Sequence, residues 1–342
     1  MLALAASFLV ALSGVGAFFA LDLPLPWLLG PLAASLIAAL LGIPMRGIKP
    51  LNDGMRTILG VAVGATLTPA VIATVPNMVP TLLLIPVMVA AIGAVGIPYF
   101  MRIWRYDFAT AYYSTMPGGL QDMLVFGEEA GGNVRTLSLI HATRVMVIVV
   151  ALPFILQGLW EADLSNPPGA PARTIPAYEL VLMVLSAGLG WWGAKRLGLF
   201  GASILGPLIV AAVVTLAGLL ENRPPAEAIW AAQFFIGMTI GTKYAGITIS
   251  ELRRDVTAAL GFCALLIILT VVFVEFVYQL GLAPGQEALL AFAPGGQAEL
   301  TVLALIVGAD VAFVVAHHVL RIFVVILGAP VAARFFNPVP RG

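Results

Sequence analysis

Charge is scarce in this 342-residue chain: Asp, Glu, Lys and Arg together make up 10% of it, whereas hydrophobic residues make up 61%. Soluble domains average about 25% charged residues, so the composition excludes an ordinary soluble protein. The net charge is zero, which excludes a basic domain of the kind that binds nucleic acid. Apolar stretches recur along the whole chain and are long enough to cross a hydrocarbon core about 30 Å thick. We therefore expect an all-α polytopic membrane protein with the lipid bilayer as its partner.

Cysteine and histidine are also few. Cys263 is the one cysteine, so no intrachain disulfide can form. Three histidines without a His-Cys cluster cannot supply a credible metal site. The sequence contains no Walker loop, dinucleotide fingerprint, zinc spacing or nucleophile elbow. We expect no metal, no cofactor and no enzymatic activity.

What the chain does contain is one short stretch that occurs twice. Pro117-Gly118-Gly119 interrupts one apolar run, and Pro294-Gly295-Gly296 interrupts another 177 residues later. Proline blocks a helical turn and glycine allows close backbone approach, so each stretch predicts a broken helix. A broken helix exposes N–H groups that attract anions and C=O groups that attract cations. The alternative is a tight turn at the membrane surface.

Polar residues follow both breaks at the same offset. A His and an Arg spaced i, i+3 come later in the next apolar run, and this spacing places both on one helix face. We expect the breaks and their neighbours to bind a solute: Pro117, Gly118, Gly119, Gln121, Arg144, Pro294, Gly295, Gly296, Gln297 and Arg321. We expect four titratable groups to carry coupling protons: Asp122, His141, Glu299 and His318. An intramembrane acid or arginine is a functional candidate by default.

Two structural alternatives stay open for these charged residues. Asp122 and Glu299 can simply satisfy the dipole at the start of the following helix. The arginines can form ion pairs with these acids instead of binding a solute.

Further matched positions at the same offset of 177 indicate a tandem duplication. We predict an N-terminal repeat (1–160), an exposed Pro-rich linker (161–176) and a C-terminal repeat (177–342). The Gly-x-x-x-Gly pairs among the matched positions predict close helix packing, and the threonines after them allow local unwinding. The matched pairs are Gly60 with Gly237, Gly64 with Gly241, Gly131 with Gly308, and Pro153 with Pro330.

Lysine and arginine predict the topology through the positive-inside rule. Six apolar segments are visible in each half, near 2–21, 27–43, 56–75, 78–100, 108–126 and 134–156, and near 178–194, 202–220, 229–249, 256–281, 287–305 and 310–333. Basic residues follow segments two and four of the first half but segments one and three of the second, so matching segments cross in opposite directions.

Opposite crossing requires an odd number of spans in the first half. The fifth segment, which carries the Pro-Gly-Gly break, then forms a re-entrant hairpin that does not cross. The predicted fold is two inverted-topology repeats, each with about five spanning helices plus one hairpin, in the bacterial inner membrane with both termini cytoplasmic. If both fifth segments cross instead, the repeats are parallel.

The duplicated LLGPL-like, Gly-x-x-x-Gly, PGG-x-x-(D/E) and H-x-x-R pattern resembles the bacterial AbrB-type membrane protein family over essentially the whole chain. Members of that family carry the labels ammonia monooxygenase and transition-state regulator. The resemblance therefore implies an inner-membrane protein, and the labels do not decide its activity. An ammonia-oxidising enzyme needs copper or iron ligands, which the three histidines cannot supply, and a DNA-binding regulator needs a soluble basic domain, which this sequence lacks.

The residues themselves favour a secondary transporter for a small polar or anionic solute, coupled to protons or sodium, with its site between the repeats. The alternatives are a membrane-embedded sensor that affects gene expression through a partner, and a membrane-bound monooxygenase. By analogy with other transporter scaffolds we also expect a homodimer.

Overall fold

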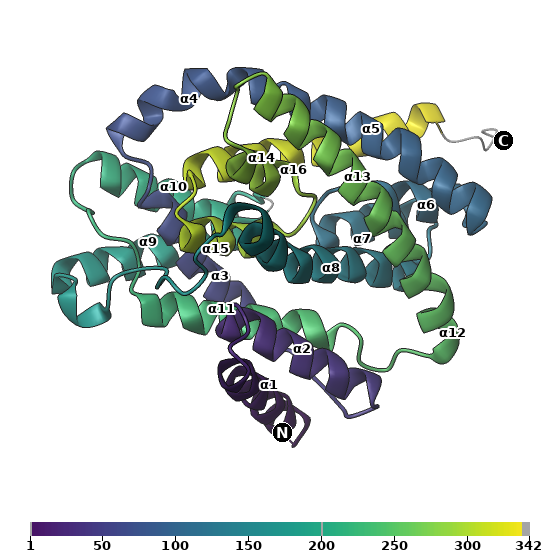
Figure 1. The fold of residues 1–342 in the computed structure, drawn as a ribbon, viewed down its shortest axis with the longest axis horizontal. Helices are drawn as coiled ribbons and strands as arrows, with labels where there is room; N and C mark the ends of the chain where they lie inside the picture. The colour runs from purple at the N-terminus through teal and green to yellow at the C-terminus, as the bar shows by residue number, and fades with distance from the viewer. Residues whose placement is uncertain (1, 200, 337–342) are drawn as a thin grey trace. The chain divides into compact units, whose positions relative to one another are not determined.

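The computed structural model describes residues 2–199 and 201–336, and every regular element in these ranges is a helix (Figure 1). Five helices are long and apolar enough to cross a membrane, which confirms the predicted class of helical membrane protein. They are Pro69–Ile103, Val134–Trp160, Ala177–Arg196, Ile249–Gln279 and Val311–Ala333.

The helices form two compact units, and each unit draws on both halves of the sequence. The first contains Met1–Asn77, Leu152–Gly246 and Ala298–Val315, and the second contains Met78–Ala151, Ile247–Gln297 and Ala316–Gly342. The first unit holds α1 (Leu2–Ala20), α2 (Pro26–Leu40), α3 (Lys49–Gly64), α9 (Ala177–Arg196), α10 (Ala202–Leu216), α11 (Ala226–Thr242) and most of α15 (Gln297–Val307). The second holds α5 (Leu84–Pro98), α6 (Phe108–Thr115), α7 (Leu120–Glu129), α12 (Ile249–Glu251), α13 (Thr257–Gln279) and α14 (Gly285–Phe292). Three helices run from one unit into the other: α4 (Pro69–Leu82), α8 (Val134–Trp160) and α16 (Val311–Phe336).

Glycine allows the closest helix contacts of the first unit. A Cβ on Gly60 of α3 would overlap the carbonyl oxygen of Ile204 in α10, and one on Gly237 of α11 would overlap that of Leu28 in α2. Gly64 and Gly241, one turn further along, meet the carbonyls of Leu208 and Leu32 in the same way. Small residues let backbones approach in this manner, so the packing role predicted for the Gly-x-x-x-Gly pairs is confirmed.

Helix boundaries differ from the sequence prediction around the third segment. The predicted run 56–75 is divided between α3, which ends at Gly64, and a helix that starts at Pro69 and continues to Ile103. Pro69 lacks an N–H group and is well suited to the first turn of a new helix. The intervening residues are stabilised locally, with Thr66 Oγ1 donating to the Val63 carbonyl at 2.7 Å. The local unwinding allowed by the threonines is therefore present.

Both Pro-Gly-Gly stretches interrupt helices as predicted. α6 ends at Thr115 and α7 starts at Leu120, while α14 ends at Phe292 and α15 starts at Gln297. The longest of these four helices has 11 residues and measures roughly 17 Å at 1.5 Å per residue. None of the four can cross a ~30 Å core alone.

The first interrupted segment turns back on itself. The backbone N–H of Asn133, just beyond α7, donates to Thr110 Oγ1 in the first turn of α6 at 2.8 Å. The entry and the exit of this segment therefore lie side by side, and we call α6, the break and α7 the first hairpin.

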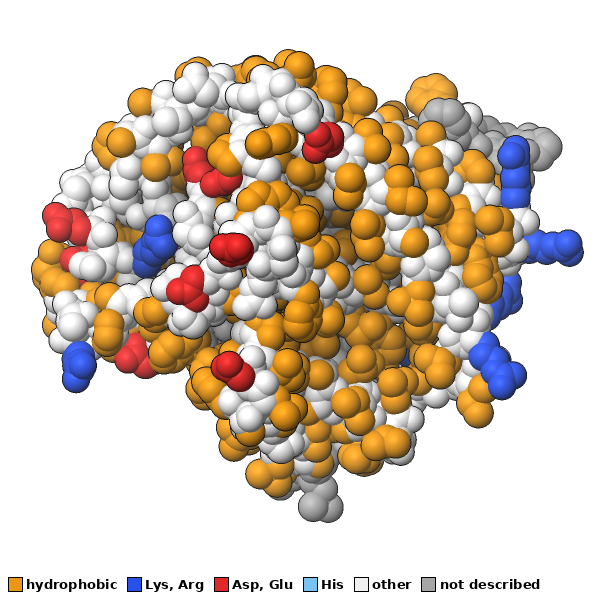
Figure 2. Space-filling view, in the orientation of Figure 1, with side chains coloured by type: hydrophobic (Ala, Val, Ile, Leu, Met, Phe, Trp, Pro, Cys, Tyr) orange, Lys and Arg blue, Asp and Glu red, His pale blue; other side chains and the backbone are white. Residues whose placement is uncertain are grey.

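Apolar side chains cover most of the surface seen in Figure 2, as expected for helices that contact lipid. Lysine and arginine side chains gather at one edge of that view, over the ends of α5 and α12 (Figures 1 and 2).

Candidate functional site

The first break leaves the carboxyl end of α6 without helical partners. Met116 leaves the helical conformation at ψ 127°, and Gly119 caps the start of α7 without a side-chain hydrogen bond. The last carbonyls of a helix lack intrahelical donors and carry a partial negative charge of about half an electron. These carbonyls need a donor, preferably a cationic one.

Arg144 of α8 supplies that donor. Its Nη1 donates to the Met116 carbonyl at 3.1 Å and its Nη2 to the Gly118 carbonyl at 3.3 Å. The side chain is only 2% exposed, so these bonds form out of contact with water. A planar guanidinium can hold two acceptors in a fixed geometry, and here it holds both sides of the break.

The second break is held in the same way. Arg321 Nη1 donates to the Ala293 carbonyl at 2.8 Å, and its Nη2 donates to the Gly295 carbonyl at 2.9 Å. Each donor and each acceptor lies 177 positions after its counterpart in the first copy. Arg321 is 3% exposed, so both arginines are buried.

The paired histidines also contact the broken helices. His141 Nε2 lies 2.9 Å from the Tyr113 carbonyl, and His318 Nε2 lies 2.9 Å from the Leu290 carbonyl. A carbonyl only accepts, so Nε2 carries the proton in both rings. Nδ1 of each ring is buried and has no hydrogen-bond partner among the described residues. A second proton there would place a positive charge beside the neighbouring arginine.

The two arginines lie near each other within the second unit. Gly118 packs against Val325 of α16, where an added Cβ would come within 2.9 Å of Val325 Cγ1. Val325 is one helical turn beyond Arg321. The first break, which Arg144 holds, therefore packs against the helix that carries Arg321. Nε of each guanidinium is buried and has no hydrogen-bond partner among the described residues.

Asp122 is not the partner of Arg144. Among the described residues of the second unit, the one ion pair joins Arg135 and Glu251 at 2.7 Å. Asp122 lies in the first turn of α7, and its Oδ2 lies 2.5 Å from where a Cβ on Gly119 would be. This is the position expected for an acid that stabilises the start of its own helix.

The remaining predicted site residues lie at or beside the breaks. Glu299 is in the first turn of α15 and is 4% exposed, and its Oε2 has no hydrogen-bond partner among the described residues. Gln297 starts α15 and is buried, as are Pro117 and Pro294. Gln121 belongs to α7, but its side chain lies outside the described residues.

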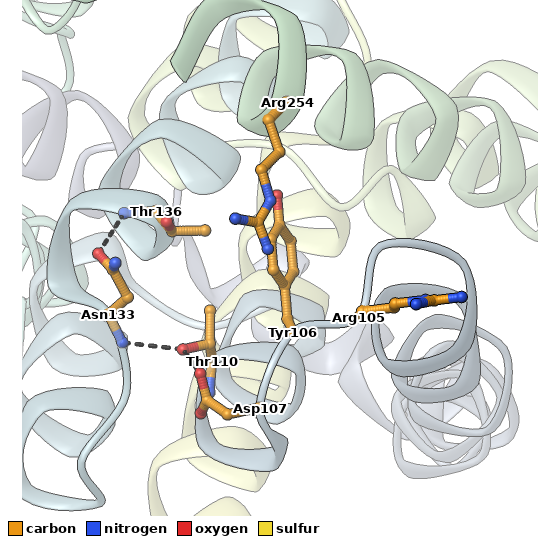
Figure 3. Close-up of a pocket in the computed structure, with 7 residues that line it drawn as sticks. All are labelled: Arg105, Tyr106, Asp107, Thr110, Asn133, Thr136 and Arg254. Atoms are coloured by element: carbon orange, nitrogen blue, oxygen red, sulfur yellow. Dashed lines mark hydrogen bonds between the residues drawn. The ribbon is translucent and has the colours of Figure 1, made fainter. Parts of the chain in front are cut away.

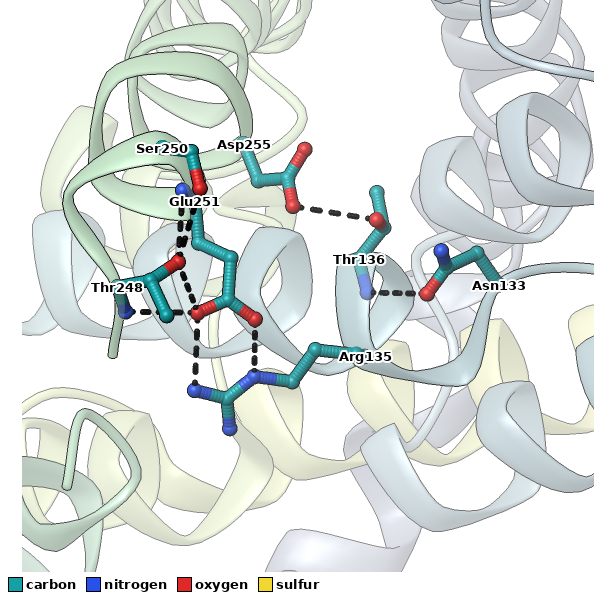
Figure 4. Close-up of polar contacts among 7 residues, drawn as sticks. All are labelled: Asn133, Arg135, Thr136, Thr248, Ser250, Glu251 and Asp255. Carbon is teal, nitrogen blue, oxygen red and sulfur yellow. Dashed lines mark hydrogen bonds and ion pairs between the residues drawn. The ribbon is translucent and has the colours of Figure 1, made fainter. Parts of the chain in front are cut away.

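A polar region at the open end of the first hairpin was not predicted. Tyr106 donates from its hydroxyl to Asp255 Oδ1 at 2.6 Å, and Thr136 Oγ1 donates to Asp255 Oδ2 at 3.1 Å. Figure 3 shows Tyr106 beneath Arg254, and Figure 4 shows Asp255 facing Thr136 beside the Arg135–Glu251 pair. The Tyr106–Asp255 contact spans 149 positions, and a single sequence has no local signal for such a pair.

The fold and these sites define the class as a multi-helix membrane protein with two interrupted helices, each held by a buried arginine. The chain belongs to the AbrB family, because the family profile described as "Transition state regulatory protein AbrB" matches residues 27–337. The predicted family is thus confirmed.

Two relatives are similar over nearly their whole length. "Uncharacterized protein YhjN" of Bacillus subtilis (strain 168) is 26% identical over 362 residues, which cover 94% of this chain and 90% of the relative. "Putative regulator AbrB" of Escherichia coli (strain K12) is 25% identical over 332 residues, which cover 94% of this chain and 92% of the relative.

Proposed function

We propose that this protein is a secondary transporter of the inner membrane for a small polar or anionic solute, coupled to protons or sodium. The observation that carries the proposal is the pair of buried arginines, each bonded to the carbonyls of a broken helix. Broken helices that face a shared site are a common way for transporters to bind a solute.

The repeated contacts support two inverted repeats. Equivalent glycines in α3 and α11 pack on equivalent carbonyls in α10 and α2. The histidine and arginine bonds to the breaks recur at one offset. Together with the alternation of basic loops between the halves, this favours repeats that cross the membrane in opposite directions, with both termini cytoplasmic.

The first hairpin supports re-entry at the fifth segment. Its two helices are short, and the contact between Asn133 and Thr110 brings its ends together. If the fifth segment enters and exits on the same side of the membrane, five segments of each half span it. The non-helical backbone at its tip is tolerated only where protein buries it or water lines it.

The arginines favour an anionic solute. A lone arginine in a membrane costs at least about 2.5–3.5 kcal/mol on insertion scales. The break carbonyls offset part of the charge, but Nε of Arg144 and of Arg321 remains unbonded among the described residues. An oxyanion between the two guanidinium groups would accept from both and relieve their mutual repulsion.

The acids beside the breaks support coupling. An ionised Asp122 or Glu299 would compete with an anion for the positive charge of the site, whereas a protonated acid would not. Proton binding and anion binding would then assist each other, which is the requirement for symport. His141 and His318 can take part only through Nδ1, because Nε2 already donates to a carbonyl.

Solid-supported membrane electrophysiology on proteoliposomes tests the proposal. Concentration jumps of small carboxylates, phosphate, sulfate and ammonium would be compared with and without proton and sodium gradients. We expect at least one anion to produce a current that Arg144→Gln and Arg321→Gln reduce more than tenfold. Arg196→Gln, at the exposed end of α9, is the control. Currents that are indifferent to both buried arginines would overturn the proposal.

The runner-up is a membrane sensor that regulates gene expression through a partner. It is favoured by the words "regulator" and "regulatory" in the names of the E. coli relative and of the family. A sensor needs a cytoplasmic surface for its partner. The longest link between helices runs from Glu161 to Pro176 and contains a single short helical turn, Ala172–Thr174. A reporter fusion that places this link in the cytoplasm would favour the sensor and contradict the inverted topology.

A further inference from the structure

A small polar pocket lies at the open end of the first hairpin, and none of its lining residues belongs to either break. Its volume is about 120 Å³. It is lined by Arg105, Tyr106, Asp107, Thr110, Asn133, Thr136 and Arg254 (Figure 3), all of which belong to the second unit.

Two helix starts form the floor of the pocket. Asp107 caps α6, accepting from Thr110 N at 2.9 Å and from Thr110 Oγ1 at 2.6 Å. Asn133 precedes α8, and its Oδ1 accepts from Thr136 N at 3.0 Å. The caps therefore use the Asp107 carboxylate and the Asn133 oxygen. The amide NH₂ of Asn133 is left available, since an asparagine has two such donors.

Arg254 forms the opposite wall. Its guanidinium lies 4.9 Å from the centre of the Tyr106 ring, the geometry of a cation–π contact. Its remaining contact is a long hydrogen bond of 3.5 Å from Nη2 to the Trp104 carbonyl. Asp255, the nearest acid in sequence, accepts from Tyr106 and Thr136 instead. Arg254 is thus an exposed cation whose donors are largely unused.

Tyr106 holds this wall in place. Burial and its hydrogen bond to Asp255 both raise the pKa of Tyr106 above its usual value, so its hydroxyl stays a donor at physiological pH.

The backbone around the pocket is unusual on both sides. Arg254 belongs to a π-helical turn, Leu252–Val256, and a second π-helical turn, Tyr99–Ile103, ends just before the pocket. Arg105 has φ 54°, a left-handed conformation that few non-glycine residues adopt. π-turns make up well under 1% of residues and occur often at functional sites. Strained residues also cluster at such sites.

The residues that line this pocket are not repeated in the second half of the sequence, unlike those of the two breaks. The positions 177 residues after Tyr106, Thr110 and Asn133 are Ala283, Glu287 and Asp310. An acid replaces the neutral donor at two of the three. The pocket is therefore not a by-product of the duplication, and its chemistry is particular to one end of the first hairpin.

We propose that this pocket binds a phosphate group through the Arg254 guanidinium and the Asn133 amide. A tetrahedral oxyanion accepts hydrogen bonds from several directions, and here the Asn133 amide lies on the floor of the pocket and the Arg254 guanidinium on the wall opposite it. The start of α8, with its neutral Asn133 cap, adds positive potential, and the basic side chains gathered at this edge in Figure 2 add more. The Asp107 carboxylate, which caps α6 and lines the same pocket, offsets part of this potential. Figure 3 shows the Arg105 side chain extending away from Tyr106, so Arg105 contributes long-range attraction. A bound phosphate would join the first hairpin to the helix that carries Arg254.

The phosphate can come from free phosphate or from an anionic lipid headgroup, and two probes separate these sources. Inorganic phosphate would be titrated onto the purified full-length protein in detergent, with chloride at matched ionic strength as the reference. Nanodiscs of phosphatidylcholine with and without phosphatidylglycerol would test the lipid. Thermal stabilisation reports binding in both cases, and native mass spectrometry counts retained lipids.

Arg254→Gln removes the cation, and Asn133→Asp keeps the oxygen that caps α8 but removes the amide donor. Arg253→Gln is the matched control, because Arg253 is exposed beside Arg254 and does not line the pocket. We expect both pocket variants to weaken binding of one probe at least tenfold and the control to retain it. If the Arg254→Gln variant does not fold, the binding measured for the Asn133→Asp variant alone tests the proposal. If the variants lose only the binding of inorganic phosphate, the ligand is a free solute. If they lose only the binding of phosphatidylglycerol, the ligand is a lipid headgroup. Binding of neither probe, or binding unchanged in both variants, overturns the proposal.

Discussion

At the scale of single residues, the two buried arginines act as caps for broken helices. Each guanidinium bonds two backbone carbonyls, and no aspartate is needed to hold Arg144 in place. Such an arrangement fixes the side chain and leaves its Nε without a hydrogen-bond partner among the described residues. In the proposed transporter, stability and solute binding would therefore both depend on the same two side chains.

Arg144→Lys and Arg321→Lys keep the charge but lose the planar fork that reaches both carbonyls. One carbonyl at each break would be left buried without a donor, which costs about 1–3 kcal/mol. We expect the free energy of unfolding in detergent, measured by denaturant titration, to fall by that amount in each variant. Arg253→Lys, on the surface, should be neutral. Wild-type stability in both variants would show that the bonds to the breaks contribute nothing.

At the scale of elements, glycine contacts determine how closely the helices of the first unit pack. Gly60→Ala and Gly237→Ala place a methyl group on a carbonyl oxygen of the facing helix. We expect each to lower the free energy of unfolding by about 1–3 kcal/mol through overpacking. Gly188→Ala is the control, because nothing lies within 4 Å of its added Cβ and it is inside α9. This control should be neutral or stabilise by up to about 1 kcal/mol.

The Thr110 hydroxyl joins the two ends of the first hairpin. Thr110→Val removes the acceptor for Asn133 N and the donor to Asp107. We expect faster amide hydrogen exchange at residues 130–133 and a loss of about 1–3 kcal/mol. Thr74→Val is a suitable comparison, because Thr74 bonds only within its own helix turn and is exposed. Equal exchange in the two variants would mean that the hairpin ends are held by other contacts.

Elements and motifs differ in how far the sequence alone could predict them. The Pro-Gly-Gly breaks and the glycine contacts were predicted because proline and glycine act on their own local backbone. The partners of the arginines were predicted less well. Backbone carbonyls are present at every residue, so no residue type signals which of them a guanidinium will bind. The network of Tyr106, Thr136 and Asp255 depends on tertiary contacts over 119 and 149 positions, which no periodicity reveals.

At the scale of the whole molecule, the central prediction is that the segments of the two halves cross the membrane in opposite directions. Asn133→Cys and Asp310→Cys occupy equivalent exposed positions at the starts of α8 and α16. In a background with the buried Cys263 replaced by serine, a membrane-impermeant maleimide should label them from opposite sides. The labelling would be read by mass shift in intact cells and in inverted vesicles. Labelling of both cysteines from the same side of the membrane would support parallel repeats in which the fifth segments span the membrane.

The contact of Gly118 with Val325 has a mechanical consequence. The first break is bonded to Arg144 on one side and pressed against α16, the helix of Arg321, on the other. A displacement of α16 therefore moves the carbonyl that holds the opposite arginine. In the proposed transporter, the first break would therefore link Arg144 to the helix of Arg321, and a solute bound at one copy of the motif would shift the other.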